Sequence, residues 1–288
     1  MFQSDMRERK RDRNGFSTKN MNESFPLTVN PYAFLEFVNQ LKHMLKKHHM
    51  KSIPIYLSEW NLTISHRDLI NDTCFKACYL IKNLLENYDR LESFGYWCLT
   101  DFIEELPLPE TLYHGGLGMF TYNGIPKAHF NAFRFLNHLD DTLIGKGDGY
   151  FITKGYERIT IIVYNYEHYS KLFATGYMMD VSDQNRYAPF TEMNMAQFMV
   201  QFSDVHYQKC LIKEMFINQL HGSSYDSWIR MGAQPLTKEE DLEFLRQQSQ
   251  PGIYLHQENI VNELLTLHIQ IAPLEVRLIE IEFHEASD

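Results

Sequence analysis

Long hydrophobic runs are missing from this 288-residue sequence, and so is any excess of basic residues. No apolar stretch approaches the roughly 20 residues that a membrane-spanning helix needs, so we expect no contact with a membrane. Residues 1–13 are charged and lack an apolar centre, so we expect no secretory signal. The chain has 27 Lys+Arg against 37 Asp+Glu, a formal charge of −10, which argues against a nucleic-acid-binding surface over most of its length.

Cysteine is also scarce, and no pattern of paired cysteines is present. The four thiols are Cys74, Cys78, Cys98 and Cys210. This usage is typical of a reducing compartment, so we expect a cytoplasmic protein. No phosphate-binding loop, dinucleotide fingerprint, nucleophile elbow or zinc-protease motif occurs, and the three histidines between residues 43 and 49 lack a carboxylate or thiolate at ligand spacing. We therefore expect no metal and no cofactor.

The composition that remains is that of a folded globular protein. Hydrophobic residues make up 44% and charged residues 22%, which excludes a disordered chain. Aromatic residues are abundant, with 17 Tyr and 20 Phe. Such a content suits an aromatic-lined carbohydrate site, but cores and sheets use the same residues.

Apolar spacing in the first half of the chain predicts alternating helices and strands. The predicted order is a helix near 34–45, a strand at 53–57, a helix near 77–85, a strand at 93–98 and a helix at 128–139. Alternation of this kind indicates a parallel sheet or an α/β barrel.

Beyond residue 145 the pattern changes to short strands separated by loops. The predicted strands are 150–153, 158–166, 195–202, 210–218, 264–271 and 276–283. They suggest an antiparallel sandwich. One helix interrupts them, and Thr237 with Glu240 fits a capping box at its start.

The first candidate for chemistry is Glu59, which ends a buried strand and precedes Trp60 and Asn61. A carboxylate in this position can be a nucleophile, with a stacking aromatic and an orienting amide beside it. It can equally be a strand-end acid that pairs with a neighbouring base. Spacing alone does not separate the two interpretations.

A second group follows the next predicted strand. Trp97 offers a flat apolar face to a sugar ring, and Glu104 and Glu105 can accept hydrogen bonds from sugar hydroxyls. Asp101 lies between Trp97 and this pair of acids in the sequence. The alternatives are a core tryptophan and solvated surface acids.

A glycine-rich loop at His114 and Gly115 forms a third candidate. Glycine allows positive φ and a close approach to a ligand, although a plain tight turn explains the same residues.

In their order along the chain, these segments resemble the C-terminal part of a glycoside hydrolase family 39 domain, the family of β-xylosidases and α-L-iduronidases. The segments are 54–61 (PIYLSEWN), 71–77 (NDTCFKA), 94–101 (FGYWCLTD), 104–105 (EE), 114–118 (HGGLG), 125–128 (IPKA), 225–232 (YDSWIRMG) and 236–241 (LTKEED). The likeness covers roughly residues 30–283. The ordered set is far more specific than any single motif.

The resemblance implies a fold class of α/β plus β. It implies the last strands and helices of a (β/α)8 TIM barrel (29–142) and an antiparallel β-sandwich (143–288), and the charged residues before them predict an irregular N-terminal segment (1–28). It implies a retaining mechanism in which Glu59 is the catalytic nucleophile.

The ligand implied is a xyloside-like carbohydrate. Trp97 matches the aromatic platform, and Glu104 and Glu105 match the acids that hold substrate hydroxyls. Further binding positions are Trp60, Asn61, Asp101, His114 and Gly115.

The sequence also departs from this family. The general acid of the family belongs to an Asn-Glu pair on the fourth barrel strand, but only Asn22–Glu23 precedes Glu59, and an aromatic usually found after the nucleophile is replaced by the residues at 64–66. A complete barrel takes about 250 residues, which leaves this chain as a fragment. We therefore expect it to be inactive alone and to need the N-terminal half of the barrel or a partner chain.

A non-catalytic role is the alternative. The same domain occurs behind an AraC-type DNA-binding module in bacterial regulators, where it senses sugars without turning them over. DNA would then be bound only through a module outside this chain. A remnant of a disrupted gene is a third interpretation.

Overall fold

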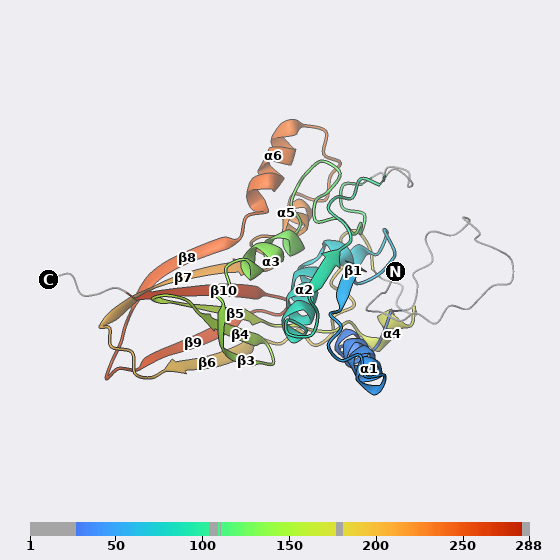
Figure 1. Cartoon of the computed structure of the whole chain (residues 1–288). Helices are drawn as coiled ribbons and strands as arrows, with labels where there is room; N and C mark the ends of the chain where they lie inside the picture. The colour runs from blue at the N-terminus through green and yellow to red at the C-terminus, as the bar shows by residue number, and fades with distance from the viewer. Residues whose placement is uncertain (1–26, 104–108, 110, 177–180, 284–288) are drawn as a thin grey trace.

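The computed structural model describes residues 27–103, 109, 111–176 and 181–283. Its helices are α1 (Ala33–Lys47), α2 (Cys74–Glu86), α3 (Ala128–Leu136), α4 (Lys171–Ala174), α5 (Ser224–Arg230) and α6 (Glu239–Gln248), with a 3-10 turn η1 (Leu69–Asp72). Its strands are β1 (Tyr56–Trp60), β2 (Ser93–Tyr96), β3 (Thr142–Gly147), β4 (Tyr150–Lys154), β5 (Arg158–Tyr164), β6 (Ala196–Phe202), β7 (Lys209–Ile217), β8 (Gly252–Asn259), β9 (Leu265–Ile271) and β10 (Val276–Phe283). Figure 1 shows the helices mainly at one end of the molecule and the longer strands at the other.

The first half of the chain contributes a pair of parallel strands and the helices beside them. β1 pairs with β2, with Tyr56 opposite Ser93 and Leu57 opposite Phe94. Helix α2 contacts α3 and also β5 and β10, so it lies between the parallel pair and the larger sheet (Figure 1). Nearly all of α2 is buried, because elements cover it on several sides.

The second half forms two antiparallel sheets. The larger has six strands in the order β3-β4-β5-β10-β7-β8, and the smaller pairs β6 with β9. A core cluster between them contains alternate residues of the facing strands, including Ile212, Ile279 and Leu267. The other face of the larger sheet packs against α2 and α3. Leu278 of β10 lies in one buried cluster with Leu80 of α2 and Phe135 of α3.

This main core cluster extends across the predicted domain boundary at residue 142. It joins Trp60 and Phe75 to Phe151, Ile162 and Leu278 without a break. A smaller cluster lies around Tyr113, Trp228 and Leu245, where α5 and α6 meet the loop after β2. The two halves of the described chain therefore share buried surface.

The predicted order of elements is confirmed, but several boundaries differ. The first strand begins at Tyr56, whereas Ile53 is exposed, and Pro54 cannot donate a ladder hydrogen bond. The capping box is wrong: α6 begins at Glu239 with Lys238 as N-cap and no side-chain capping bond.

The strand directions follow the predicted change from a parallel to an antiparallel arrangement along the chain. Parallel pairing among the described strands is confined to β1 and β2, and the other sheets are antiparallel. Strands β3 and β8 were not predicted, and the apolar residues of β8 are consecutive and do not alternate. No helix in the described part of the chain combines the length and apolarity needed to cross a membrane.

Candidate active site

The carboxyl ends of β1 and β2 bring the first two groups of predicted residues together. One extra residue in β1 interrupts its pairing with β2 between Leu57 and Trp60. This irregularity turns Trp60 to the same buried side as Leu57, as an inserted residue does in a strand. Glu59, between them, stays half-buried near the end of the strand.

Trp60 lies in the core and has no face for a ligand. Its indole is 1% exposed and stacks on Tyr79 at a centroid distance of 5.5 Å, with Phe34 at 5.3 Å. An enclosed ring cannot stack on a sugar, so the predicted binding role of Trp60 is corrected to core packing.

Asn61 connects the ends of the two strands. Its side-chain amide donates to the Trp97 carbonyl, and the Trp97 N–H donates to the Trp60 carbonyl at 3.0 Å. The buried Lys76 ammonium donates to the Asn61 carbonyl oxygen and, at 3.1 Å, to that of Asn71. Because Asn61 itself is buried, its role in the structure is to hold Trp97 in place beside β1 and not to face a ligand.

Trp97 is an accessible aromatic residue at this edge. Its side chain is 42% exposed, whereas Trp60 and Trp228 are buried. Glu59 and Trp97 thus stand at the ends of adjacent parallel strands, and both are open to solvent to some degree. Glu104 and Glu105 lie outside the described residues.

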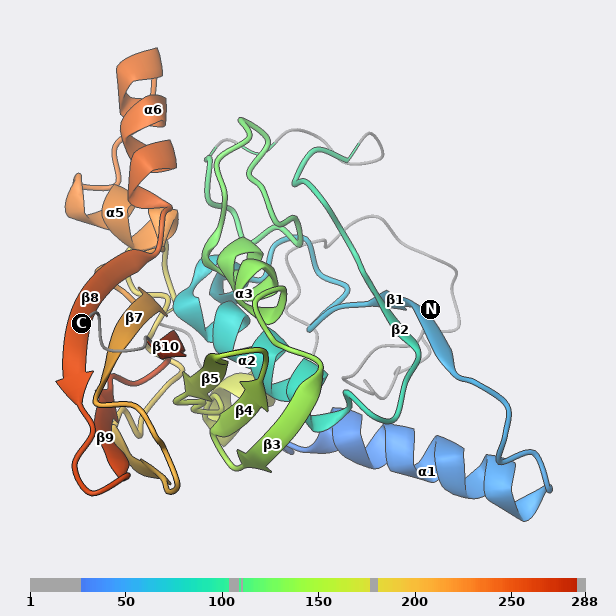
Figure 2. The same cartoon turned by 60° about the vertical axis from the view of Figure 1, so that its left-hand side comes forward.

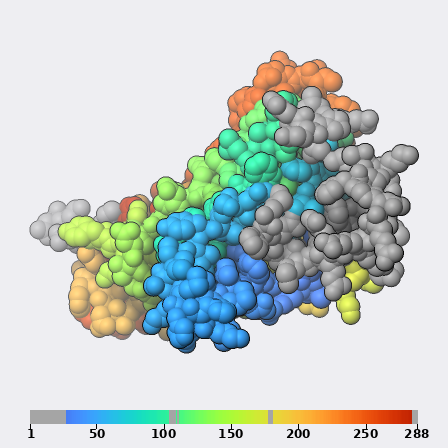
Figure 3. Space-filling model, turned by 45° about the vertical axis from the view of Figure 1, so that its right-hand side comes forward, coloured from blue at the N-terminus to red at the C-terminus, as the bar shows by residue number. Residues whose placement is uncertain are grey.

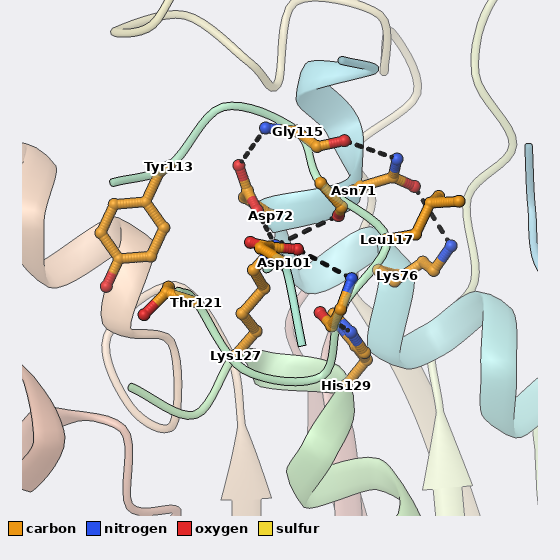
Figure 4. A network of polar contacts seen from close by, with 12 residues as sticks. Asn71, Asp72, Lys76, Asp101, Tyr113, Gly115, Leu117, Thr121, Lys127 and His129 are labelled. Carbon is orange, nitrogen blue, oxygen red and sulfur yellow. Dashed lines mark hydrogen bonds and ion pairs between the residues drawn. The ribbon is translucent and has the colours of Figure 1, made fainter. Parts of the chain in front are cut away.

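Asp101 belongs to a buried network of charges instead of a ligand surface. Lys127 Nζ lies 2.6 Å from Asp101 Oδ2 and 2.6 Å from Asp72 Oδ1, and Arg186 Nη1 lies 2.5 Å from Asp72 Oδ2. All four side chains are fully buried. Figure 4 shows Asp72, Asp101 and Lys127 pointing toward one another beneath the Gly115 loop. The predicted binding role of Asp101 is therefore corrected to a structural one.

Opposite charges set the ionisation of this network. Burial alone would raise the pKa of Asp72, but Lys127 and Arg186 lower it to about 2. Burial raises the pKa of Asp101, which shares Lys127 with Asp72. Burial would lower the pKa of Lys127, but the two carboxylates together raise it. Lys127 is therefore a permanent cation that both aspartates need.

The glycine loop approaches its own chain closely. Gly115 has φ +77°, in the region that glycine allows, and its N–H donates to Asp72 Oδ2 at 2.7 Å. A Cβ at this position would lie 2.4 Å from the Asp68 carbonyl. His114 is buried, and burial lowers its pKa, so the imidazole is neutral near pH 7. The close approach is therefore to the protein itself, which corrects the predicted ligand contact of Gly115.

Sequence reasoning missed Lys76, Lys127 and Arg186. Lys76 and Lys127 fall within the segments that resemble the family, but a lysine there gives no sign of burial. Arg186 lies in the long connection between β5 and β6, and nothing in its neighbourhood points to a partner more than a hundred residues away.

Two surface hollows lie away from Glu59 and Trp97. One is lined by α6 residues, among them Glu240 and Phe244, and the other by residues between Leu139 and Tyr156 at β3 and β4. Among the residues that the structure describes, no group of three His, Cys, Asp or Glu side chains is arranged to hold a metal ion.

Residues 7–259 match the family model of Glycosyl hydrolases family 39. The chain belongs to this family. It is 27% identical over 253 residues to a β-xylosidase of Geobacillus stearothermophilus, and the match covers 88% of this chain and 46% of the relative. It is 22% identical over 250 residues to an uncharacterized HTH-type transcriptional regulator of Staphylococcus aureus, covering 86% of this chain and 32% of the regulator.

Solved structures of the family share the fold. A monomeric β-xylosidase from Caulobacter crescentus superposes with a TM-score of 0.78 at 19% identity, over 95% of this chain and 54% of that chain. The family 39 enzyme from Xanthomonas axonopodis gives 0.77 at 19% identity, over 94% and 53%. The chain thus spans about half the length of these relatives and is a partial family 39 domain.

Proposed function

We propose that this chain is the nucleophile-bearing part of a retaining glycosidase that acts on β-xylosides, with Glu59 as the nucleophile. The observation that carries the proposal is the placement of Glu59 and the exposed Trp97 at the ends of two adjacent parallel strands. Membership of family 39 and the likeness to a β-xylosidase supply the reaction class and the sugar.

The proposed chemistry requires two carboxyl groups. Glu59 attacks the anomeric carbon as the glycosidic bond breaks, and a second carboxylic acid gives its proton to the leaving oxygen. In retaining enzymes the two groups lie about 5–5.5 Å apart, and water later releases the sugar. Trp97 presents an apolar face on which the sugar ring packs. Glu104 and Glu105 remain proposed partners of the sugar hydroxyls.

We propose that the general acid lies in a part of the protein outside the 288 residues described by this sequence. β1 and β2 are then the last strands of a barrel, and other strands cover their outer side. Support comes from the half-length match to relatives and from large apolar side chains left exposed beside the pair, Ile53, Tyr56, Leu99 and Phe102. Figure 3 shows the surface of α1 and of the segment leading to β1 (blue) open on this face. We expect the isolated chain to associate or to be poorly soluble, because exposed apolar strands are prone to aggregate.

A test of Glu59 can avoid the missing acid. An aryl β-xyloside with a strongly acidic phenol, such as dinitrophenol, leaves without protonation, so the nucleophile alone can form the glycosyl-enzyme. We expect release of the phenol and a gain of one pentosyl unit in the intact mass of the wild-type chain. Peptide mapping should place the unit on Glu59.

The matched variants are Glu59→Gln and Glu92→Gln. Glu92 is exposed one strand away, just before β2, so its substitution removes a nearby acid without touching the proposed site. Labelling should persist in Glu92→Gln and vanish in Glu59→Gln. Equal labelling of both variants would remove Glu59 from the mechanism.

A sugar-sensing domain of a transcriptional regulator is the second candidate. The similarity to the Staphylococcus aureus regulator over 250 residues favours it, although the identity is lower than with the β-xylosidase. Under this proposal the chain binds a xyloside, as measured by calorimetry, but the activated substrate gives no adduct.

A further inference from the structure

The two edges of the six-stranded sheet differ in how they are protected. Proteins guard edge strands with lysine, proline, bulges or short length, because an open edge can pair with another chain. Edge strand β3 follows this rule: its pairing with β4 is irregular between Leu143 and Gly145, and it carries Lys146.

The opposite edge strand, β8, has none of these devices. It is eight residues long, pairs with β7 in unbroken register and contains neither lysine nor proline. Three consecutive large apolar residues are exposed on it: Ile253 at 63%, Tyr254 at 58% and Leu255 at 56%. Figures 1 and 2 show no described element against its outer edge. The strand is therefore open to pairing along its length.

The histidine and carboxylate side chains of β8 indicate which partner can pair with this strand. Alternation along a strand puts His256 and Glu258 on one face, where His256 Nε2 lies 3.7 Å from Glu258 Oε1. In an antiparallel pair with a second copy, centred on Gln257, each His256 stands opposite Glu258 of the other copy. The same register, continued two residues past the end of β8, sets Ile253 opposite the exposed Val261, which forms a β-bridge with Leu264. Two imidazole–carboxylate contacts and two apolar contacts then form about one two-fold axis.

We propose that β8 is a homodimer interface, in which two copies of this chain join their six-stranded sheets edge to edge around Gln257. The occupant is a second copy, because the His256–Glu258 pattern is complementary to itself in this register. An edge pairing buries less surface than a standard interface, so the dimer is weak, with a dissociation constant on the order of micromolar.

Charge substitutions test the register. His256→Glu sets Glu opposite Glu258, and Glu258→His sets His opposite His256, so each variant alone should dimerise roughly tenfold more weakly or worse. An equimolar mixture of the two variants restores both opposite pairs and should dimerise like the wild type. Sedimentation velocity of the full chain measures the dimerisation of all three samples.

The mixture also guards against misfolding, since an unfolded variant cannot be rescued by the other. A wild-type chain that sediments as a monomer at tens of micromolar would overturn the proposal. So would a mixture no better than its components.

A cysteine test reports the two-fold axis directly. Residues opposite each other in an antiparallel pair have Cα atoms about 4.5–5.5 Å apart, within the range of a disulfide. Gln257→Cys should therefore oxidise to a covalent dimer, while Ile253→Cys, which faces Val261, should not. Equal cross-linking of both variants would refute the register.

Association through the exposed side of β1 and β2 is a separate process and has its own control. Leu99→Lys changes that side and leaves β8 intact, so it should not affect the β8 dimer. If Leu99→Lys abolishes dimerisation and the β8 variants do not, the interface lies at β1 and β2 and the proposal fails. The β-xyloside labelling of Glu59 does not depend on either result.

Discussion

Removal of the Lys127 ammonium should be among the most damaging single changes to this chain. Lys127→Met keeps the apolar stem but leaves Asp72 with Arg186, and Asp101 with the Gly118 N–H at 2.8 Å. Both carboxylates were 2.6 Å from the lost cation, and neither can reach water. Breaking a buried ion pair by removing one partner costs about 3–5 kcal/mol. We expect a loss of stability in that range.

Urea unfolding, followed by circular dichroism at low protein concentration, measures the change. The matched control is Lys146→Met, which removes an exposed lysine 3.9 Å from Asp89 and should cost less than about 1 kcal/mol. The double variant Lys127→Met/Asp101→Asn should recover part of the loss, because the uncompensated charge is gone.

The deficit of Lys127→Met should also depend on pH. Without the cation, Asp101 takes up a proton more readily in the folded protein than in the unfolded chain. The free energy of unfolding of the variant should then fall as the pH rises above the ordinary pKa range of an aspartate. A deficit no larger than that of Lys146→Met, or no recovery in the double variant, would refute the argument that buried charge balance holds this loop.

Three further predictions concern buried groups outside this network. Burial raises the pKa of Asp226 to about 6, so its contribution to stability is present below pH 4 and is lost as pH rises to about 6; Asp226→Asn should flatten that part of the stability–pH curve measured by urea unfolding. Trp60→Ala should lower the free energy of unfolding by about 3–5 kcal/mol in the same assay, and Trp97→Ala by less than about 1 kcal/mol. Only Trp97→Ala should abolish the quenching of tryptophan fluorescence by iodide. Similar losses of stability would contradict the different burial of the two rings. Gly115→Ala should destabilise much more than Gly124→Ala, because both have positive φ but only at Gly115 would a Cβ meet a backbone carbonyl, at 2.4 Å; equal thermal shifts would show that the loop relaxes freely.

The sequence predicted much of the element order because apolar periodicity reports local burial. Helix α2 and the strands around Ile161 and Ile279 carry strong patterns and form where expected. Strand β8 was missed for the same reason, since an open edge with consecutive apolar residues has no alternation to detect.

The candidate site was predicted less evenly. Glu59 and Trp97 were found as polar and aromatic residues at strand ends, and the structure leaves both accessible. Trp60 and Asp101 were chosen on the same grounds but are buried, because a one-residue irregularity in β1 and a cation from α3's N-cap decide where they point. Neither cause can be recognised from spacing.

The sequence by itself determined the family, the succession of helices and strands, and the strand that carries Glu59, since each depends on order along the chain. Tertiary structure decided which of these residues meet. Arg186 reaches Asp72 across more than a hundred residues, and Lys127 is shared between Asp72 in η1 and Asp101 in the loop after β2. Such contacts depend on how separate elements pack, and the low dielectric of the interior then gives them their strength.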